Sequence, residues 1–297
     1  MTKTLLITGA SGFLGAPLCR IAQSQWQVKG VYHQHPINVD DPDFQALDLT
    51  DTLAITDWFQ THRPDAVIHT AAISKPNHCE QDPDLSYRVN VTASVSLATL
   101  CRDYSIPFVF TSTDQVFDGK AAPYDESSLP KPINVYGRHK LTAEQRIREI
   151  YPAGTICRLP LLYGPSSTHS TCFVQGFLAQ LEAGQPLYLF EDEYRTPAYV
   201  DDVAAGLLLA LDHPGTLLHL GGPERLSRYE FGVKMAEVFG LEHRLIQSCR
   251  QADVTMAAPR PADVSVNSQR AMDLGYSPRS IDDGLNTIFR QSPELGK

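Results

Sequence analysis

Three glycines near the start of the chain constrain its fold more than any other feature. Gly9, Gly12 and Gly15 follow a short apolar run, Thr4–Thr8, and precede a segment with helical periodicity. Because glycine has no Cβ, such a loop lets the amide groups of a helix N-terminus approach a phosphate closely. A Gly-x-x-Gly-x-x-Gly loop between a strand and a helix therefore indicates a dinucleotide-binding βαβ unit. A glycine-rich turn of no function is the alternative, and the strand–loop–helix setting disfavours it.

The first half of the chain alternates short apolar runs with helical patterns. We expect strands at residues 4–8, 27–32, 66–69, 108–112 and 155–158, and helices at about 13–25, 53–62, 89–104 and 136–150. Regular alternation of this kind favours parallel pairing through crossover helices. The predicted fold is therefore α/β, a doubly wound parallel sheet of Rossmann type.

The pattern loosens in the second half. It predicts a helix at 173–182, strands at 187–190 and 217–220, and a helix that begins at Ser227, where Ser-x-x-Glu has the form of a capping box. We interpret residues 1–165 as a dinucleotide-binding domain and residues 166–297 as a smaller substrate-binding region. The second region is expected to be interleaved with the first, with some segments returning to the main sheet.

Charge and cysteine usage narrow the class of function. The net charge of -9 and the isoelectric point near 5.5 argue against nucleic-acid or anionic-membrane binding, because both need a basic surface. The six cysteines are scattered without a Cys-x-x-Cys pair, so we expect reduced thiols, mostly in the core. The first strand starts almost at the initiator methionine and no apolar run is long enough to span a bilayer, so a cytoplasmic protein is expected.

The second strand bears on the choice of cofactor. An acidic residue at its end would bind the adenosine ribose of NAD(H), but residues 31–35 contain none. NADP(H) is therefore favoured, with His33 as the best local candidate, and NAD(H) remains an alternative because no arginine is present either. His33 and His35 could instead bind a metal, but two histidines without a carboxylate partner more often belong to a solvated loop.

Other positions are expected to line the same cofactor. Asp48 and Leu49 would meet the adenine, and Ala71 and Ala72 follow the strand at 66–69. The full set expected to bind the cofactor is Gly9, Ser11, Gly12, Phe13, Leu14, Gly15, His33, Asp48, Leu49, Ala71, Ala72, Tyr136 and Lys140.

Tyr136 and Lys140 form the second informative pattern. Side chains at i and i+4 share one face of a helix, so the phenol and the ammonium are expected to project into the same space. The pKa of a free tyrosine is about 10, and a nearby cation favours the phenolate by about 1 to 3 pKa units. The pair is therefore expected to act as a proton donor near neutral pH. Exposed Tyr and Lys at this spacing are common, and only the glycine loop and the hydroxyl run at 111–113 favour the functional interpretation.

These motifs together resemble the extended short-chain dehydrogenase/reductase family. They are the Thr-Gly-x-x-Gly-x-x-Gly loop, Asp48, Ala71, Ala72, Asn90, Thr113 and Tyr136-x-x-x-Lys140. Residues 112–119, 132–137 and 260–263 are similar to the branch that contains dTDP-4-dehydrorhamnose reductase, and the likeness spans nearly the whole chain. The same stretches are similar to the regulatory subunit of methionine adenosyltransferase, which shares this fold.

The resemblance implies a nicotinamide-dependent reductase of a 4-keto nucleotide sugar. Hydride would pass from the nicotinamide to the ketone carbon while Tyr136 protonates the oxygen. Thr113 would bind that oxygen and so contact the substrate, Lys140 would hold the nicotinamide ribose, and Asn90 would organise the proton relay.

The resemblance also implies a substrate subsite. Arg195 and Arg260 match positions that face the substrate diphosphate, which needs bidentate donors, although each could equally be a surface ion-pair partner. Cys172 stands where related reductases often have asparagine, and Pro17 stands where some have a metal-associated glutamate, so no bound metal is expected. A nucleotide sugar is thus the expected partner, and a homodimer is left open.

Two other functions remain open. An epimerase or dehydratase of the same family is one, but dehydratases carry Asp-Glu after the active threonine, whereas this chain has Asp114 and Gln115. An amide does not take up a proton usefully, so elimination is disfavoured. A cofactor-binding regulatory subunit without catalysis is the other alternative, because fold does not imply function.

Overall fold

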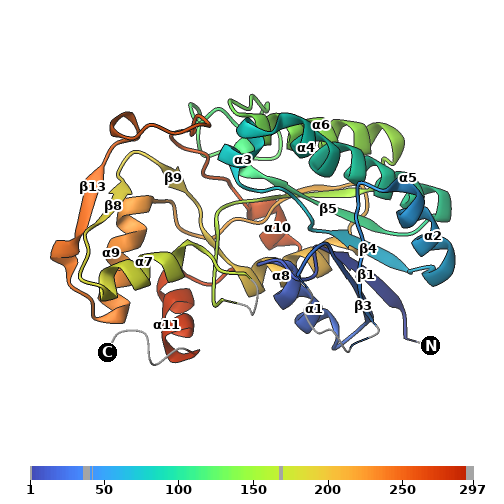
Figure 1. Ribbon diagram of the computed structural model, residues 1–297, viewed down its shortest axis with the longest axis horizontal. Coiled ribbons are helices and arrows are strands. Elements are labelled where there is room, and N and C mark those ends of the chain that lie inside the picture. The colour runs from blue at the N-terminus through green and yellow to red at the C-terminus, as the bar shows by residue number, and fades with distance from the viewer. Residues whose placement is uncertain (1, 36–40, 42, 167–169, 292–297) are drawn as a thin grey trace.

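The computed structural model describes residues 2–35, 41, 43–166 and 170–291. Within these ranges the central sheet has seven strands, all parallel, in the order β11-β6-β5-β4-β1-β2-β3 (Figure 1). They are β1 (Thr4–Thr8), β2 (Gln27–Tyr32), β3 (Phe44–Ala46), β4 (Ala66–His69), β5 (Phe108–Thr113), β6 (Thr155–Leu159) and β11 (Leu217–His219). The chain order reverses at β1, and ligands of open α/β sheets bind beyond the carboxyl ends of the strands at such a point.

Helices cover both faces of this sheet (Figure 1). On one face lie α1 (Gly15–Ala22), α8 (Val200–Ala210) and α10 (Gln269–Asp273), and on the other α2 (Thr52–His62), α5 (Ala93–Tyr104) and α6 (Val135–Ile150). Successive strand residues point to opposite faces, so Leu5 and Ile7 enter one core while Leu6 enters the other. The unbroken apolar run of β1 follows from this double burial.

A smaller body lies beside the sheet, at the left of Figure 1. It contains α7 (Phe173–Glu182), α9 (Arg228–Phe239), α11 (Ile281–Gln291) and the parallel pair β8 (Leu187–Phe190) and β13 (Ile246–Cys249). Two further small sheets pair β7 (Leu162–Tyr163) with β10 (Ala198–Tyr199), and β9 (Tyr194–Arg195) with β12 (Leu226–Ser227). A third apolar cluster fills this body, with Tyr163, Phe231 and Leu285 fully buried in it.

The predicted fold class is confirmed. All the strands expected in the first half are present, and β11 returns to the central sheet beside β6. The short strand β3 was not expected, and its three residues pair with β2. The capping box at the start of α9 is confirmed, because Ser227 N donates to Glu230 Oε2 (2.7 Å) and Glu230 N donates to Ser227 Oγ (3.1 Å).

Two helices differ from their expected lengths. The helix expected at 13–25 spans only Gly15–Ala22. Turns with a three-residue spacing lie on both sides of it, from Gly12 N to Gly9 O (2.8 Å) and from Gln25 N to Ala22 O (3.0 Å). The helix expected at 89–104 is interrupted by a π-helical segment, η1 (Arg88–Thr92), before α5. Such segments are frequent at functional sites, and η1 carries Asn90.

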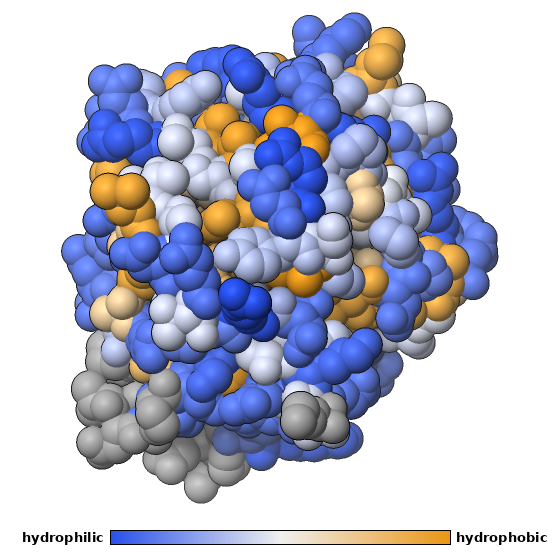
Figure 2. Space-filling view, turned by 90° about the vertical axis from the view of Figure 1, so that its right-hand side faces the viewer, coloured by the Kyte–Doolittle hydropathy of each residue, from blue (hydrophilic) through white to orange (hydrophobic). Residues whose placement is uncertain are grey.

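The cysteines lie mostly in the core, as expected. All six cysteines are unpaired, and Cys19, Cys79, Cys101 and Cys157 are buried. Figure 2 shows a face on which hydrophilic residues predominate and hydrophobic ones are scattered. Among the described residues, no helix combines the length and apolarity that crossing a membrane would require.

Candidate active site

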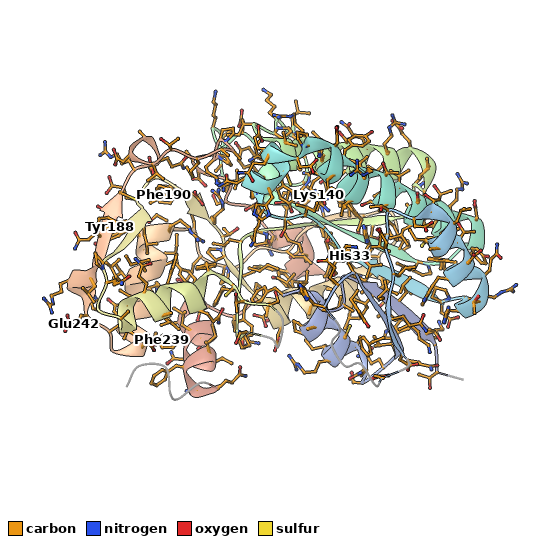
Figure 3. All side chains as sticks on the ribbon, in the orientation of Figure 1. His33, Lys140, Tyr188, Phe190, Phe239 and Glu242 are labelled. Carbon is orange, nitrogen blue, oxygen red and sulfur yellow. The ribbon has the colours of Figure 1, made fainter. Side chains whose placement is uncertain are left out.

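A cleft with a volume of about 1080 Å³ lies beyond the carboxyl ends of β1, β4 and β5. It is lined on the sheet side by His33 and Lys140 and on the other side by Phe190, all labelled in Figure 3. Every residue expected to bind the cofactor lines this one cleft. Thr113, Arg195 and Arg260 line it too, and among the predicted site residues only Asn90 does not. Their roles in binding or catalysis stay predictions.

The glycine loop has the shape that a pyrophosphate needs. Gly9 has φ +67°, and a Cβ there would lie 2.8 Å from Ala71 N. At Gly15 a Cβ would lie 2.0 Å from Gly9 O, so no larger residue fits without moving the backbone. The close approach of three chain segments leaves the start of α1 open to a ligand, which fits a dinucleotide at the switch point of the sheet.

The end of the cleft near His33 and Asp48 is polar and exposed. His33 stands at the end of β2 with an exposed side chain. Asp48 Oδ1 accepts hydrogen bonds from Thr50 N (2.8 Å) and Thr50 Oγ1 (2.8 Å), and these two bonds hold the pKa of Asp48 below its usual value. Asp48 thus shapes its own turn, while its position still borders the cleft.

Tyr136, Lys140 and Thr113 meet at the inner end of the cleft. The first two project from one face of α6, which begins at the Asn134 cap, where Asn134 Oδ1 accepts from Gly137 N (2.8 Å). Tyr136 is 7% exposed and Lys140 is 1% exposed. Thr113 ends β5, and its hydroxyl accepts from Gln115 N (3.2 Å) and donates to Asp114 Oδ1 (3.1 Å).

The expectation that Lys140 lowers the pKa of Tyr136 is wrong for this structure. Burial raises the pKa of Tyr136 above its ordinary value, a hydrogen bond with the Thr113 side chain lowers it, and the charge of Asp114 raises it. Burial also lowers the pKa of Lys140 to about 7, although Glu144 raises it. The reason is shared desolvation: the pocket that brings the two groups together disfavours the charged form of each.

Lys140 is held by groups that the sequence analysis missed. Its Nζ lies 4.0 Å from the centre of the Phe110 ring, and Glu144 is the next residue on the same helix face. Glu144 is paired with Arg158 of β6, with Arg158 Nη2 2.7 Å from Glu144 Oε2. The i, i+4 spacing of Lys140 and Glu144 was the available signal.

Asn90 acts on the backbone beside the cleft. It is fully buried, and its Oδ1 accepts from Ile73 N (3.0 Å) while its Nδ2 donates to Ile73 O (3.1 Å). These bonds fix the segment that follows β4, which carries Ala71 and Ala72 along the cleft wall. In this structure its side chain holds this segment in place, and its expected role in the proton relay stays a prediction.

The part of the cleft lined by Arg195, Glu193 and Arg260 is rich in charged side chains. Arg195 is buried, and its Nη1 donates to Tyr194 O (2.6 Å) and Pro261 O (3.2 Å). Its guanidinium also lies 3.8 Å from Asp114 and 3.4 Å from Glu193. Burial raises the pKa of Asp114 to about 6, and Arg195 lowers it. The donors of Arg195 are thus largely used within the protein.

Arg260 and Arg228 differ from Arg195 in this respect. Arg260 Nη2 donates to Asn77 Oδ1 (3.1 Å), and among the described residues its Nη1 is buried without a partner. Arg228, the first residue of α9, also lines the cleft, and its buried Nη1 likewise lacks a partner in the described part of the chain. Sequence reasoning missed Arg228, because the capping box shows where α9 begins but not which way its first residue points.

A seven-stranded parallel sheet with a glycine loop at its switch point, and a Tyr–Lys pair in the same cleft, defines a Rossmann-type α/β protein. Residues 2–292 match the family described as RmlD substrate binding domain. The chain therefore belongs to that family.

Three relatives show how far the similarity extends. The chain is 36% identical over 289 residues to the probable low-salt glycan biosynthesis reductase Agl14 of Haloferax volcanii, covering 95% of this chain and 96% of that protein. It is 29% identical to methionine adenosyltransferase 2 subunit beta of Xenopus laevis, over 94% of this chain and 84% of that one. The dTDP-4-dehydrorhamnose reductase of Bacillus anthracis, solved in complex with NADP, has a TM-score of 0.86 at 25% identity, covering 98% and 100%.

Proposed function

We propose that this protein is an NAD(P)H-dependent reductase of a 4-keto nucleotide sugar. One observation carries the proposal: Thr113, Tyr136 and Lys140 line the same cleft as the glycine loop. The family and the reductase relatives support the reaction class. The dTDP-4-dehydrorhamnose type is the finer form of this proposal.

The side chains suit a proton transfer coupled to reduction. The bound nicotinamide supplies the hydride in this chemistry. The Tyr136 hydroxyl keeps its proton at neutral pH, since burial holds its pKa high, and so presents a proton to a developing alkoxide. The Thr113 hydroxyl, in hydrogen-bond contact with that phenol, would orient the carbonyl oxygen between the two. Lys140 would bind the nicotinamide-ribose hydroxyls as a donor.

The cofactor that fits best is NADP(H). The end of β2 presents His33 and has no carboxylate at residues 31–35 that would repel a 2′-phosphate. The Bacillus anthracis relative was solved with NADP, which agrees with this choice. Oxidation of NADH at a rate comparable to that of NADPH would show that the enzyme has no preference between them, without changing the proposed reaction.

The test is oxidation of NADPH and NADH against a panel of 4-keto nucleotide sugars. We expect NADPH turnover with at least one of them. Tyr136→Phe should lower kcat by about 100-fold or more, because it removes one general-acid hydroxyl, and should leave NADPH affinity within about twofold. Full activity in that variant would remove Tyr136 from the mechanism, and no turnover with any keto sugar would refute the reductase.

A regulatory subunit is the second candidate, favoured by the similarity to methionine adenosyltransferase 2 subunit beta. The two candidates differ in what the cleft must do. A regulatory subunit would bind the cofactor and hold a partner enzyme stably without turnover. Co-purification of such a partner, together with an inert keto-sugar panel, would favour it. A dehydratase is disfavoured because Gln115 is an amide whose Oε1 accepts from Asn134 Nδ2 (2.9 Å).

A further inference from the structure

We propose that Arg228, together with Arg260, binds the diphosphate of the substrate, and that Arg195 instead holds the cleft wall. The proposal rests on the proposed function in one respect, because it takes the ligand to be a nucleoside diphosphate. It assigns the ligand contact to a residue that no sequence motif indicated, and it reassigns one that a motif did indicate.

The three arginines differ in how many of their hydrogen-bond donors are already used within the protein. Arg195 gives Nη1 to two backbone carbonyl oxygens and lies between two carboxylates, Asp114 and Glu193. Arg228 and Arg260 each have a buried Nη1 without a partner among the described residues. A buried cationic donor left unpaired is unfavourable, so these two groups point to an anion that arrives from outside the protein.

The guanidinium group of Arg228 is stacked on an aromatic ring. Its guanidinium carbon lies 4.1 Å from the centre of the Phe173 ring and 5.5 Å from that of Phe177, both on α7. Stacking on an aromatic ring fixes the plane of the guanidinium before a ligand binds. A planar fork held in this way suits bidentate recognition of phosphate oxygens, and less ordering entropy is lost on binding.

Other charged side chains surround the guanidinium group of Arg228. Burial lowers the pKa of Arg228 to about 10, Glu193 raises it, and Arg195 and Arg260 lower it. Arg228 therefore stays charged at neutral pH while facing two like charges and one carboxylate. A ligand with two or more negative charges would relieve this repulsion, and a neutral sugar would not.

Arg225 offers a matched comparison with Arg228. Arg225 is also stacked on an aromatic ring, with its guanidinium carbon 3.7 Å from the centre of the Tyr194 ring. Its charge is already paired with Asp263, at 2.7 Å, and it does not line the cleft. Arg225 is therefore the control for Arg228: the same side chain, also stacked, but outside the cleft.

The experiment is calorimetric titration of the full chain, saturated with NADP⁺, with dTDP, dTMP and thymidine, and with UDP as a second base. Saturation keeps these nucleotides out of the cofactor end of the cleft. We expect Arg228→Met to weaken diphosphate binding about ten- to a hundredfold, the range for a lost hydrogen bond to a charged group, and to leave thymidine binding within about twofold. Arg225→Met should change neither.

Several outcomes would overturn the proposal. They are unchanged diphosphate affinity in Arg228→Met, an equal loss for thymidine, or failure of the wild-type chain to bind any nucleoside diphosphate. If Arg228→Met does not fold, Arg228→Lys and Glu193→Gln carry the test. The lysine, which keeps the charge but not the fork, should bind the diphosphate more weakly than arginine, and Glu193→Gln should tighten it. No change in both would equally overturn the assignment.

The readout separates this proposal from the proposed function. Nucleotide binding needs no turnover, so an inert keto-sugar panel with a large Arg228 effect would refute the reductase and keep the subsite. Turnover of a keto sugar with the same KM in Arg228→Met and wild type would keep the reductase and refute the subsite. A raised KM with a nearly unchanged kcat is the kinetic result we expect, because the diphosphate is remote from the reacting carbon.

Discussion

Glu144→Gln tests the buried ion pair next to Lys140 on the same helix. Glu144 and Arg158 are each 3% exposed, and two hydrogen bonds join them: Nε to Oε1 (3.0 Å) and Nη2 to Oε2 (2.7 Å). Ser112 Oγ also donates to Oε1, at 2.5 Å. The carboxamide would keep the shape of Glu144 but remove its charge and turn an acceptor into a donor that faces Arg158.

The expected loss follows from the burial of the pair. Breaking a buried ion pair by removing one partner costs about 3–5 kcal/mol, because the remaining charge is left uncompensated. Natural proteins have about 5–15 kcal/mol of stability in total, so this loss is a large fraction of it. Removing Arg158 as well takes away the uncompensated charge, so Glu144→Gln/Arg158→Met should recover part of the loss.

The assay is urea unfolding of the wild type and of the single and double variants, in the same buffer without NADPH, which gives the free energy of unfolding of each. Glu149→Gln is the control on the same helix. Glu149 is exposed, so its neutralisation should change the free energy of unfolding by less than about 0.5 kcal/mol. A loss below about 1 kcal/mol in Glu144→Gln would refute the reasoning. So would a double variant as unstable as the single one, since uncompensated charge could not then be the cause.

Two further predictions concern the cofactor. Gly15→Ala should weaken NADPH binding at least about tenfold, because its Cβ would meet Gly9 O at 2.0 Å. The control is Gly176→Ala, whose Cβ would have nothing within 4 Å; it should bind NADPH normally and be at least as stable as the wild type. Fluorescence titration measures NADPH binding, and thermal unfolding measures stability. Burial lowers the pKa of Lys140 from 10.5 to about 7, so the charged form is lost as pH rises through that value, and NADPH should bind more tightly at pH 6 than at pH 9. This pH dependence should disappear in Lys140→Met, and its persistence there would assign it to another group.

The fold was largely predictable because its signals are local. Double burial gives β1, β4 and β5 each an apolar run of three residues, and the crossover helices show their own period. Element ends were less predictable, since the turns on either side of α1, from Gly12 N to Gly9 O and from Gln25 N to Ala22 O, have no periodic signal in the sequence. The strand β3 has three residues, two of them exposed, and such a short run has no period to detect.

The residues gathered in the cleft were predictable to the extent that motifs mark them. The glycine loop, Thr113, Tyr136 and Lys140 each stand at a strand end or on a helix face that the sequence defines. Arg228 was not found, because its importance depends on Phe173, which is distant in the sequence. The spacing of Glu144 from Lys140 was visible in the sequence, but the ion pair of Glu144 with Arg158 was not. Stacking and ion pairing of this kind arise only when segments from different parts of the chain pack together.

The electrostatics of Tyr136 show where spacing alone misleads. An i, i+4 pair gives the direction of two side chains, and the expected effect of Lys140 assumed a charge in partly solvated surroundings. In the structure, burial of both groups raises the pKa of Tyr136 and lowers that of Lys140. A phenol that holds its proton at neutral pH is suited to give it only when negative charge develops on a bound carbonyl oxygen. In the proposed reaction, proton transfer would therefore be driven by the basicity of the substrate alkoxide and not by an acidic tyrosine, and Lys140 would contribute mainly by holding the cofactor.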